Sequence, residues 1–450
     1  MKLRNNLCYL VLGAALALGV VAPAQALEKL SMWITKGFYP DEDEALSLAI
    51  RRFEQKARAK VELTLLTTQE IAPKTIAALE AGTEPDLAFG HVFDFQVTGK
   101  WAAEGKLVDL SDIITPAKNR FLPNTISTTY LQGLNGKRSY YAMPIYQQTL
   151  HIQYWKDMLT EAGFSPSDIP QDWHGYWSFW CDKVQPAYQR RTGKKVYAVG
   201  LPFGVSSSDS HYGYYQFMLA YNVRLVDDNG KLLVDDPKNK AGMVSALKDY
   251  TDILAKGCTP PGSIDWKDPD NNQAFHKKEI IMTPNPTISI AAKWLDDIRN
   301  PTTPIQRATA RRNYYEYVAT ASLPNKPDGS PMSNLAAVKT AVVFSSSKSQ
   351  KLAKEFLAFL IEDANLIPYT EGSHGRWYPV TKAGADRPFW VDGKDVHRKA
   401  VSNQFRAGTG VFPFVYNYKF TVLNNENVWA KAMHRVVKDK WTPERAVDEM

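Results

Sequence analysis

The chain has 450 residues, more than one hydrophobic core usually serves, so two or more lobes are expected. Apolar residues make up 44% and charged residues 22%, a composition that excludes a disordered or low-complexity chain. The formal net charge is +7, but the basic residues are scattered rather than gathered in one tract, and this pattern does not favour nucleic-acid binding.

The first 26 residues have the three parts of a secretory signal peptide. Lys2 and Arg4 give a positive start, an apolar run spans 7–21, and Ala-Gln-Ala at 24–26 is a small-residue cleavage site. The run is too short to be a stable membrane span, and no other uninterrupted run of about 18 apolar residues exists. Cleavage near Ala26 therefore predicts a soluble exported protein that begins at Leu27.

Cys181 and Cys258 are the only cysteines after the predicted cleavage site. In an oxidising compartment they could form one disulfide, and two free buried thiols remain the alternative. Two cysteines alone make no metal site, and the histidines show no metal-ligand spacing. We therefore expect no metal and no cofactor.

The first hundred residues alternate between strands and helices. Strands are expected at 30–34, 61–66 and 85–91, with helices at 41–53 and 71–79 between them. This spacing predicts βαβ units and a mostly parallel sheet. Ligands of such sheets bind outside the carboxyl ends of the strands, which nominates residues 33–38 and 91–95.

The stretch 139–163 joins two β-prone runs at Pro144 and ends in an amphipathic segment before Gly163. Proline removes a ladder N–H, so Pro144 marks a bend or a strand end. Polar and aromatic groups follow it, among them Tyr146, Gln147 and His151. One interpretation is a crossing between two compact bodies, and the other is a strand, turn and helix inside one domain.

The rest of the chain continues the alternation of helices, strands and polar turns. A hairpin is expected around Asn229-Gly230, because Asn-Gly between two apolar runs favours a tight turn. The other expected elements are an aromatic-rich helix within 173–191, a polar loop at 204–212, a helix at 240–254, a polar turn at 266–275, a strand from 280 into Pro-Asn-Pro, a strand at 339–344, a helix at 350–361, a glycine-rich turn at 369–379, and a final helical segment that reaches the end of the sequence.

The order of these pieces resembles the extracellular solute-binding proteins (family 1) that serve ABC importers of sugars. The similar motifs lie at 141–163, 229–231 with 246–248, 272–275 with 282–283, 347–360 and 371–380, and together they span the chain after the signal peptide. The resemblance implies an α/β, two-lobe periplasmic-binding-protein fold (type II-like). It also implies a periplasmic monomer whose partners are a small-molecule solute and the permease subunits of the inner membrane.

In such a fold each lobe is discontinuous in sequence. The expected N-terminal lobe comprises 27–143 plus 290–361, and the expected C-terminal lobe comprises 144–289 plus 362–450. The hinge crossings would be the stretch 139–163, a return near 283–289 and a third crossing near 361–369.

A sugar site needs aromatic planes for the C–H faces of the ring and directed hydrogen-bonding groups for its hydroxyls. Each aromatic residue could instead pack in the core, and aspartate or asparagine in a turn can cap a helix. The predicted stacking residues are Trp33, Tyr146, Trp177, Trp266 and Trp377. The predicted polar residues are Asp94, Gln147, Asp209, Asp270, Asn271, Asn272, Asn285, Glu371 and Arg376, with Gly372 and Tyr378 in the same turn as the last two.

The function expected from this pattern is capture of a carbohydrate (a mono- or oligosaccharide or a polyol) by hinge closure, without catalysis. Because Arg376 is positively charged, a phosphorylated or anionic solute, such as a glycerol phosphate ester, is the alternative. A secreted glycosidase would need two carboxylates across a cleft, and Glu371 and Asp270 are the candidates for that pair. No Gly-x-Ser-x-Gly, His-Glu-x-x-His or phosphate-loop motif occurs. A polyamine binder would need a cleft dominated by acids.

The extra Trp and His residues within 173–212 depart from the family pattern. They leave the identity of the solute undecided.

Overall fold

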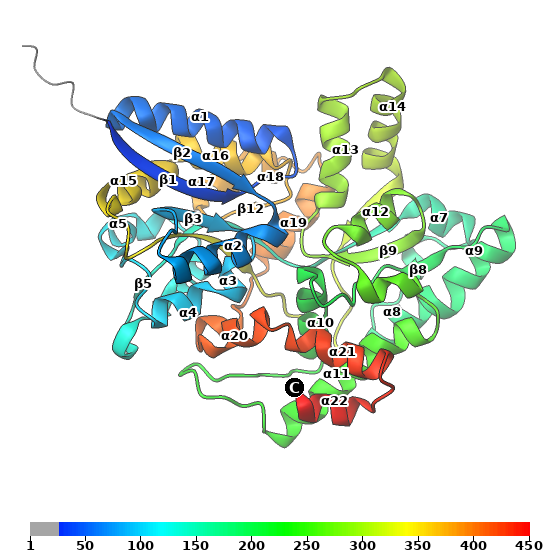
Figure 1. Cartoon of the computed structure of the whole chain (residues 1–450). Coiled ribbons are helices and arrows are strands. Elements are labelled where there is room, and N and C mark those ends of the chain that lie inside the picture. The colour runs from blue at the N-terminus through cyan, green and yellow to red at the C-terminus, as the bar shows by residue number, and fades with distance from the viewer. Residues whose placement is uncertain (1–26) are drawn as a thin grey trace, which may run out of the picture.

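The computed structural model of the chain describes residues 27–450, so the predicted signal peptide lies outside the described residues. Two lobes lie side by side, each built around its own sheet (Figure 1). In the described part of the chain no helix is long and apolar enough to cross a membrane.

The first lobe contains a six-stranded sheet in the order β12-β6-β11-β3-β1-β2. As the alternation predicted, β1 is parallel to both β2 and β3, whereas β11 and β12 are antiparallel to their neighbours. The strands are β1 (Glu28–Thr35), β2 (Ala59–Leu66), β3 (Leu87–Gly90), β6 (Met143–Gln148), β11 (Ala337–Val343) and β12 (Tyr378–Pro379).

The helices of this lobe bury amphipathic faces against the sheet and against each other. In α1 (Pro40–Ala57) the apolar positions Leu46, Ala49 and Phe53 fall on one face and are all buried. They belong to the same core cluster as the apolar face of α15 (Gln350–Leu360). The other helices are α2 (Thr68–Ala81), α3 (Phe93–Gln96), α4 (Thr98–Ala103), α5 (Ser111–Ala117), α6 (Pro123–Ser127) and α16 (Asp363–Gly372), and a small ribbon pairs β4 (Tyr130–Gln132) with β5 (Arg138–Tyr140).

The second lobe contains a four-stranded sheet in the order β10-β7-β9-β8. Its strands are β7 (His151–Trp155), β8 (Tyr197–Val199), β9 (Ile280–Asn285) and β10 (Val318–Ala321), and only β8 and β9 run parallel. Its helices are α7 (Lys156–Glu161), α8 (Trp173–Ser178), α9 (Gln185–Thr192), α10 (Ser208–Ala220), α11 (Pro237–Ala255), α12 (Asp270–His276), α13 (Ser289–Arg299), α14 (Pro304–Arg312) and α19 (Val396–Arg406).

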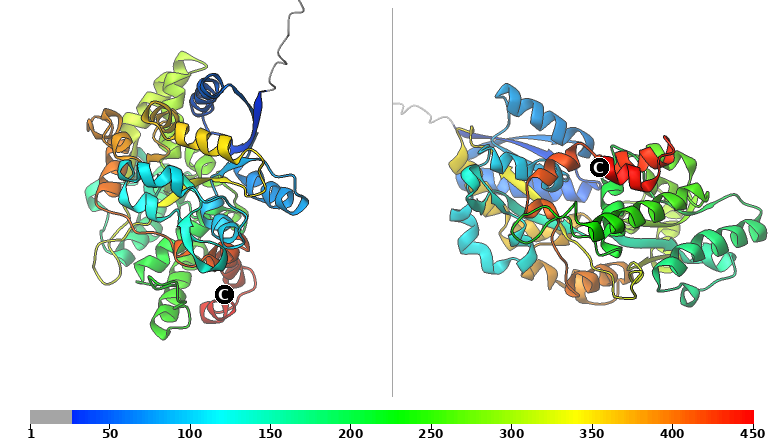
Figure 2. Two further views of the ribbon diagram at one scale, coloured as in Figure 1. Left: turned by 90° about the vertical axis from the view of Figure 1, so that its left-hand side faces the viewer. Right: turned by 90° about the horizontal axis from the view of Figure 1, so that it is seen from below.

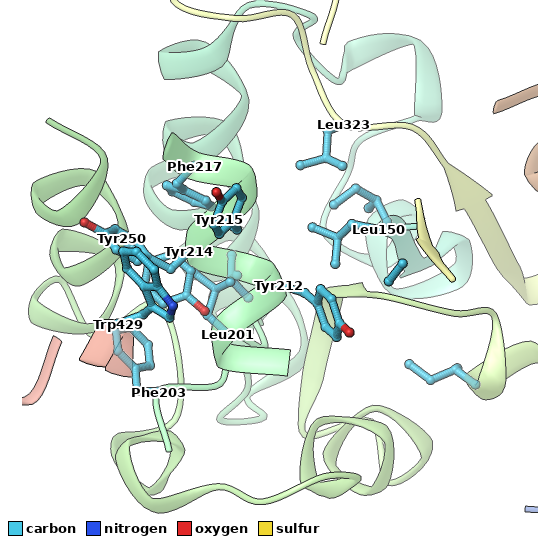
Figure 3. Close-up of a cluster of buried hydrophobic side chains, with 14 of the residues drawn as sticks. Leu150, Leu201, Phe203, Tyr212, Tyr214, Tyr215, Phe217, Tyr250, Leu323 and Trp429 are labelled. Atoms are coloured by element: carbon cyan, nitrogen blue, oxygen red, sulfur yellow. The ribbon is translucent and has the colours of Figure 1, made fainter. Parts of the chain in front are cut away.

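Helix α10 is buried on nearly every side and carries the aromatic core of the second lobe. Tyr214, Tyr215 and Phe217 of this helix lie in one aromatic cluster with Tyr250 (Figure 3). Phe217 also packs against Trp177. A disulfide joins Cys181, in the helical turn after α8, to Cys258, which follows α11. The bridge lies within the second lobe and settles the alternative that the sequence left open.

The chain crosses between the lobes at places that differ from the expected ones. The first crossing is in the predicted stretch, but Pro144 lies within β6, and the change of sheet falls between Gln148 and His151. The return falls between β10 and β11, because Trp294 of α13 packs on Trp155 and Phe275 of the second lobe. Residues 290–321 therefore join the second lobe, while β6 and β12 join the first sheet rather than the second.

The third crossing, expected near 361–369, falls later, because α16 packs on α1 and β12 joins the first sheet, whereas α19 packs on β10 of the second lobe. After the short helices α17 (Lys382–Ala385) and α18 (Pro388–Val391), α20 (Lys419–Asn425) packs on the first lobe, where Asn424 donates a hydrogen bond to the Phe95 carbonyl. Helices α21 (Val428–Val437) and α22 (Pro443–Glu449) pack on α11 of the second lobe (Figure 2). This C-terminal segment, 419–450, therefore contacts both lobes.

Candidate functional site

A cavity of about 50 Å³ lies between the two lobes and is lined by both of them. The first lobe contributes Phe38, Thr68, His91, Val92, Gln148, Lys339, Arg376 and Trp377. The second lobe contributes Ser208, Asp209, Tyr212, Asp268, Pro269, Asn272, Asn285, Pro286, Thr287 and Ser289.

Several of the lining residues lie at the ends of strands. Phe38, Thr68 and His91 follow the carboxyl ends of β1, β2 and β3, while Gln148 ends β6 and Asn285 ends β9. This is where ligands of open α/β sheets bind. Two of these residues, Phe38 and His91, fall inside the segments that the strand-end rule nominated.

Trp377 provides the aromatic surface of the cavity. Its ring stacks on Tyr146 at 4.5 Å between centroids with an interplanar angle of 14°, and the His91 ring packs at its edge. Its Nε1–H donates to Glu42 Oε1 over 3.1 Å. His91 in turn bonds the Tyr146 hydroxyl over 2.7 Å, and burial holds the pKa of His91 well below its ordinary value. The indole is therefore fixed on the side away from the cavity, as a binding surface requires.

Arg376 lies between two aromatic rings and faces the cavity. Its Cζ is 3.3 Å from the centroid of Phe38 and 4.3 Å from that of Trp377. Nη1 lies 3.8 Å from Glu42 Oε2, and neither Nε nor Nη1 has a hydrogen-bond partner within residues 27–450. Buried guanidinium N–H groups without acceptors are costly, so they are available to a solute that supplies oxygen atoms.

Lys339 is a second buried cation, with 1% of its side chain exposed. Its Nζ lies 3.1 and 3.2 Å from the two carboxylate oxygens of Asp94 and 2.8 Å from the Tyr212 hydroxyl of the second lobe. Burial lowers the pKa of Lys339 and raises that of Asp94, and the ion pair opposes both shifts. The register of β11 against β6 shifts between Lys339 and Thr340, an irregularity of the kind that re-aims side chains beside binding sites.

The second lobe faces the cavity with neutral amides and hydroxyls. Ser289 Oγ accepts hydrogen bonds from Asn272 Nδ2 over 2.8 Å and from Asn285 Nδ2 over 2.9 Å. Asn285 Nδ2 also lies 3.2 Å from Asn272 Oδ1. Such groups both donate and accept, which suits hydroxyl-rich solutes.

Two aspartates lie where α10 begins. The Asp268 carboxylate accepts from the Ser208 N–H over 3.0 Å and from the hydroxyls of Ser207 and Ser208 over 2.6 Å each. Asp209 accepts from Asn271 Nδ2 over 3.2 Å. Burial, and then the charge of Asp268, raise the pKa of Asp209 well above its ordinary value, so this carboxyl group favours the neutral form.

The structure brings half of the predicted site residues together. Asp209, Asn272, Asn285, Arg376 and Trp377 line the cavity. Behind them, and in contact with lining residues, lie Asp94, Tyr146 and Asn271.

The other predicted aromatic residues lie away from the cavity. Trp33 packs half-buried against the core, and Trp177 packs against Phe217 within the second lobe. Trp266 is half-buried, and its backbone lies so close to Gly204 that a Cβ there would meet the Trp266 carbonyl oxygen. Tyr378 stacks on Phe405, with centroids 4.2 Å apart.

The remaining predicted polar residues hold turns and chain crossings. Asp270 accepts from the Lys267 N–H over 2.8 Å, and Gln147 donates to the Pro379 carbonyl over 2.8 Å. Glu371 pairs with Arg387 at 3.3 Å. Gly372 lies against the backbone of α1, where a Cβ would be 2.7 Å from the Asp41 carbonyl oxygen.

Several lining residues were not predicted individually. One of them carried a usable signal, because Lys339 is the only charged residue in the mostly apolar strand Ala337–Val343, and lysine is almost never fully buried without a partner. Ser208 and Tyr212 lie in the polar run 204–212, whose composition is typical of a loop that faces a cleft. The Thr287 and Ser289 side chains carried no signal that separates them from ordinary turn and helix residues. Among residues 27–450 no group of three or more His, Cys, Asp or Glu side chains could hold a metal ion.

Comparisons with known proteins place this architecture in a family. Residues 49–399 match the family described as bacterial extracellular solute-binding protein. The chain is 26% identical over 356 residues to the diacetylchitobiose binding protein DasA of Streptomyces coelicolor, covering 76% of this chain and 71% of DasA. It is 22% identical to an arabinooligosaccharide-binding protein of Bacillus subtilis, covering 70% of this chain and 63% of that protein.

Solved structures share the fold over almost the whole length. An ABC transporter solute-binding protein of Thermotoga lettingae with bound α-D-tagatose superimposes with a TM-score of 0.74 at 21% identity, covering 94% of this chain and 97% of that one. Maltose-bound MalE3 of T. maritima gives a TM-score of 0.70 at 19% identity, covering 93% and 97%. The two-lobe periplasmic-binding-protein fold expected from the sequence is therefore confirmed. The chain belongs to the family of bacterial extracellular solute-binding proteins.

Proposed function

We propose that this chain is the periplasmic solute-binding component of an ABC importer and that it captures a carbohydrate between its two lobes. The observation that carries the proposal is the composition of the interlobe cavity, where Trp377, Phe38 and Arg376 line the first lobe and amides and hydroxyls line the second. Aromatic rings pack against the C–H groups of a sugar, while the guanidinium and the amides bond its hydroxyls. The names of the two relatives, which specify saccharides, support the same class of solute.

Capture proceeds by closure of the lobes. The solute contacts both lobes only when they are closed, so its binding shifts the population toward the closed form. Contacts between the two lobes, such as that of Lys339 Nζ with the Tyr212 hydroxyl, further stabilise the closed form. The permease in the inner membrane then receives the solute from the closed protein, which acts as a monomer and leaves the solute chemically unchanged. The signal peptide directs export and is removed by cleavage near Ala26.

A second candidate solute is a phosphorylated or anionic one, such as a glycerol phosphate ester. It is favoured by the two partnerless nitrogen atoms of Arg376 in the cavity wall. Guanidinium groups bind phosphate and carboxylate bidentately, so this observation alone does not decide the charge of the solute.

A thermal-shift screen with mono- and disaccharides, polyols and glycerol phosphates tests the proposal. A bound solute at a hundred times its Kd should stabilise the protein by about 2.7 kcal/mol. The variant Trp377→Ala should lose the shift, whereas Trp441→Ala, which changes a tryptophan outside the cavity, should keep it. Denaturing the complex should return the saccharide intact, and recovery of cleaved sugar would establish a glycosidase instead.

A further inference from the structure

Each buried cation of the cavity is matched by a buried carboxylate that does not itself line the cavity. Asp94 contacts Lys339 through both of its oxygens, and Glu42 lies behind Arg376. The exposed fractions of the Asp94 and Glu42 side chains are 4% and 1%. Neither carboxylate is among the lining residues, so their effect on a solute is electrostatic rather than by contact.

Glu42 has the hydrogen-bond environment of an ionised group. Oε1 accepts from Trp377 Nε1–H over 3.1 Å, and Oε2 accepts from the Phe38 backbone N–H over 3.3 Å. The Tyr146 hydroxyl lies 3.4 Å from Oε1, and the Arg376 guanidinium lies beside Oε2. Burial raises the pKa of Glu42, but Arg376 and the donors around both oxygens oppose that shift and favour the carboxylate form.

A third carboxylate, that of Asp268, lines the cavity and adds to its negative charge. The Asp268 carboxylate is already satisfied by the Ser208 N–H and two hydroxyls at the start of α10. Two cations, Lys339 and Arg376, therefore stand against three carboxylates, those of Glu42, Asp94 and Asp268. An anionic solute would enter a region of low dielectric with no uncompensated positive charge, where repulsion by these carboxylates disfavours it.

We infer that Glu42 is a specificity-determining residue: by neutralising Arg376 it makes the cavity accept neutral carbohydrate and reject the same carbohydrate carrying a carboxylate or phosphate. This inference rests on the proposed function and names its solute class. The free N–H groups of Arg376 still donate to hydroxyl or ring oxygens, which need no counter-charge. Glu42 also fixes the Trp377 indole, so one side chain sets both the charge and the aromatic surface.

The test measures binding of matched sugars by isothermal titration calorimetry. The probes are glucose, galactose, maltose and cellobiose, each paired with the same sugar in which one primary alcohol is a carboxylate. The wild type should bind the neutral member of a pair at least tenfold more tightly than the acidic member. Glu42→Gln keeps the size of the side chain but removes its charge, so the ratio of the two Kd values should fall by at least tenfold.

Two further variants serve as controls. Glu44→Gln removes a carboxylate from the exposed side of the same helix and should leave the ratio unchanged. Asp94→Asn makes the corresponding change behind Lys339 and should lower the ratio in the same direction, which keeps the test informative if Glu42→Gln does not fold.

Tighter binding of an acidic member by the wild type, or an unchanged ratio in both Glu42→Gln and Asp94→Asn, would overturn the inference. Absence of binding by every probe, neutral and acidic, would instead contradict the carbohydrate function on which the inference rests.

Discussion

His211 is a histidine without a hydrogen-bond partner on either ring nitrogen within the described residues. It is buried in α10, stacks on Phe95 of the first lobe with centroids 4.8 Å apart, and packs near Phe412. Burial, and then the charge of Lys339, lower its pKa from 6.5 to about 3. The folded protein therefore keeps this ring neutral at a pH where the unfolded chain is already protonated.

We expect His211→Phe to make the protein more resistant to acid. As pH falls below 6.5 the unfolded chain takes up a proton that the folded protein takes up only near pH 3, so the wild type loses stability through this group. The loss between pH 7 and pH 5 is about 2 kcal/mol, from the linkage relation with these two pKa values. Urea unfolding of both proteins at pH 7 and pH 5 measures it, and equal losses in the two proteins would contradict the expectation.

At the scale of single elements, the disulfide ties the helical turn after α8 to the end of α11 across 77 residues of chain. Both ends belong to the second lobe, and neither cysteine lines the interlobe cavity. Closing a loop of this length constrains the unfolded state more than the folded one.

The double variant Cys181→Ala/Cys258→Ala should therefore lose about 2–4 kcal/mol of stability and keep its affinity for a bound saccharide. Unfolding in urea gives the first quantity and calorimetry the second. Treatment of the wild type with dithiothreitol should lower stability in the same way, and a changed Kd would mean that the bridge shapes the cleft.

The sequence predicted elements well where local signals are strong. The alternation of strands and helices in residues 28–90, and the apolar face of α15, appear as expected. The assignment of strands to lobes was less accurate, because it depends on which sheet a strand joins and not on its own residues. Pro144 illustrates the difference: it was expected to end a strand, but β6 accommodates it beside the register shift in β11.

Only half of the predicted site residues lie in or directly behind the cavity, because the position of the others also depends on how the lobes pack. Strand ends nominated Phe38 and His91 correctly as cavity-lining positions, because the geometry of parallel sheets fixes them. Trp266, in a polar turn beside asparagines, had the same local signature as Trp377 but lies outside the cavity. The packing of the two lobes decides which of the two tryptophans lines the cavity. Local sequence patterns do not predict that packing.

At the scale of the whole molecule, closure depends on contacts between the lobes. The Tyr39 hydroxyl, just before α1 in the first lobe, donates to the carbonyl of Ser289, the first residue of α13 in the second lobe, over 2.7 Å. Tyr250 makes a bond of the same kind and length, to the Pro202 carbonyl, but entirely inside the second lobe.

These two tyrosines allow a matched comparison. Tyr39→Phe should raise the Kd for a saccharide about 2- to 10-fold, because a net hydrogen bond contributes about 0.5–1.5 kcal/mol and this one joins the closed lobes. Tyr250→Phe should lower stability and leave the Kd unchanged. If both variants bind as the wild type does, the Tyr39 contact does not contribute to closure.

The division of each lobe along the chain also governs when the protein can fold. The first sheet needs β11 and β12, which begin at Ala337 and Tyr378, and α20 to α22 are added to both lobes only after that. Contacts of such large sequence separation slow folding and delay it until most of the polypeptide is present. A chain emerging from the ribosome therefore cannot complete either core, and it stays unfolded, as passage through a secretion channel requires.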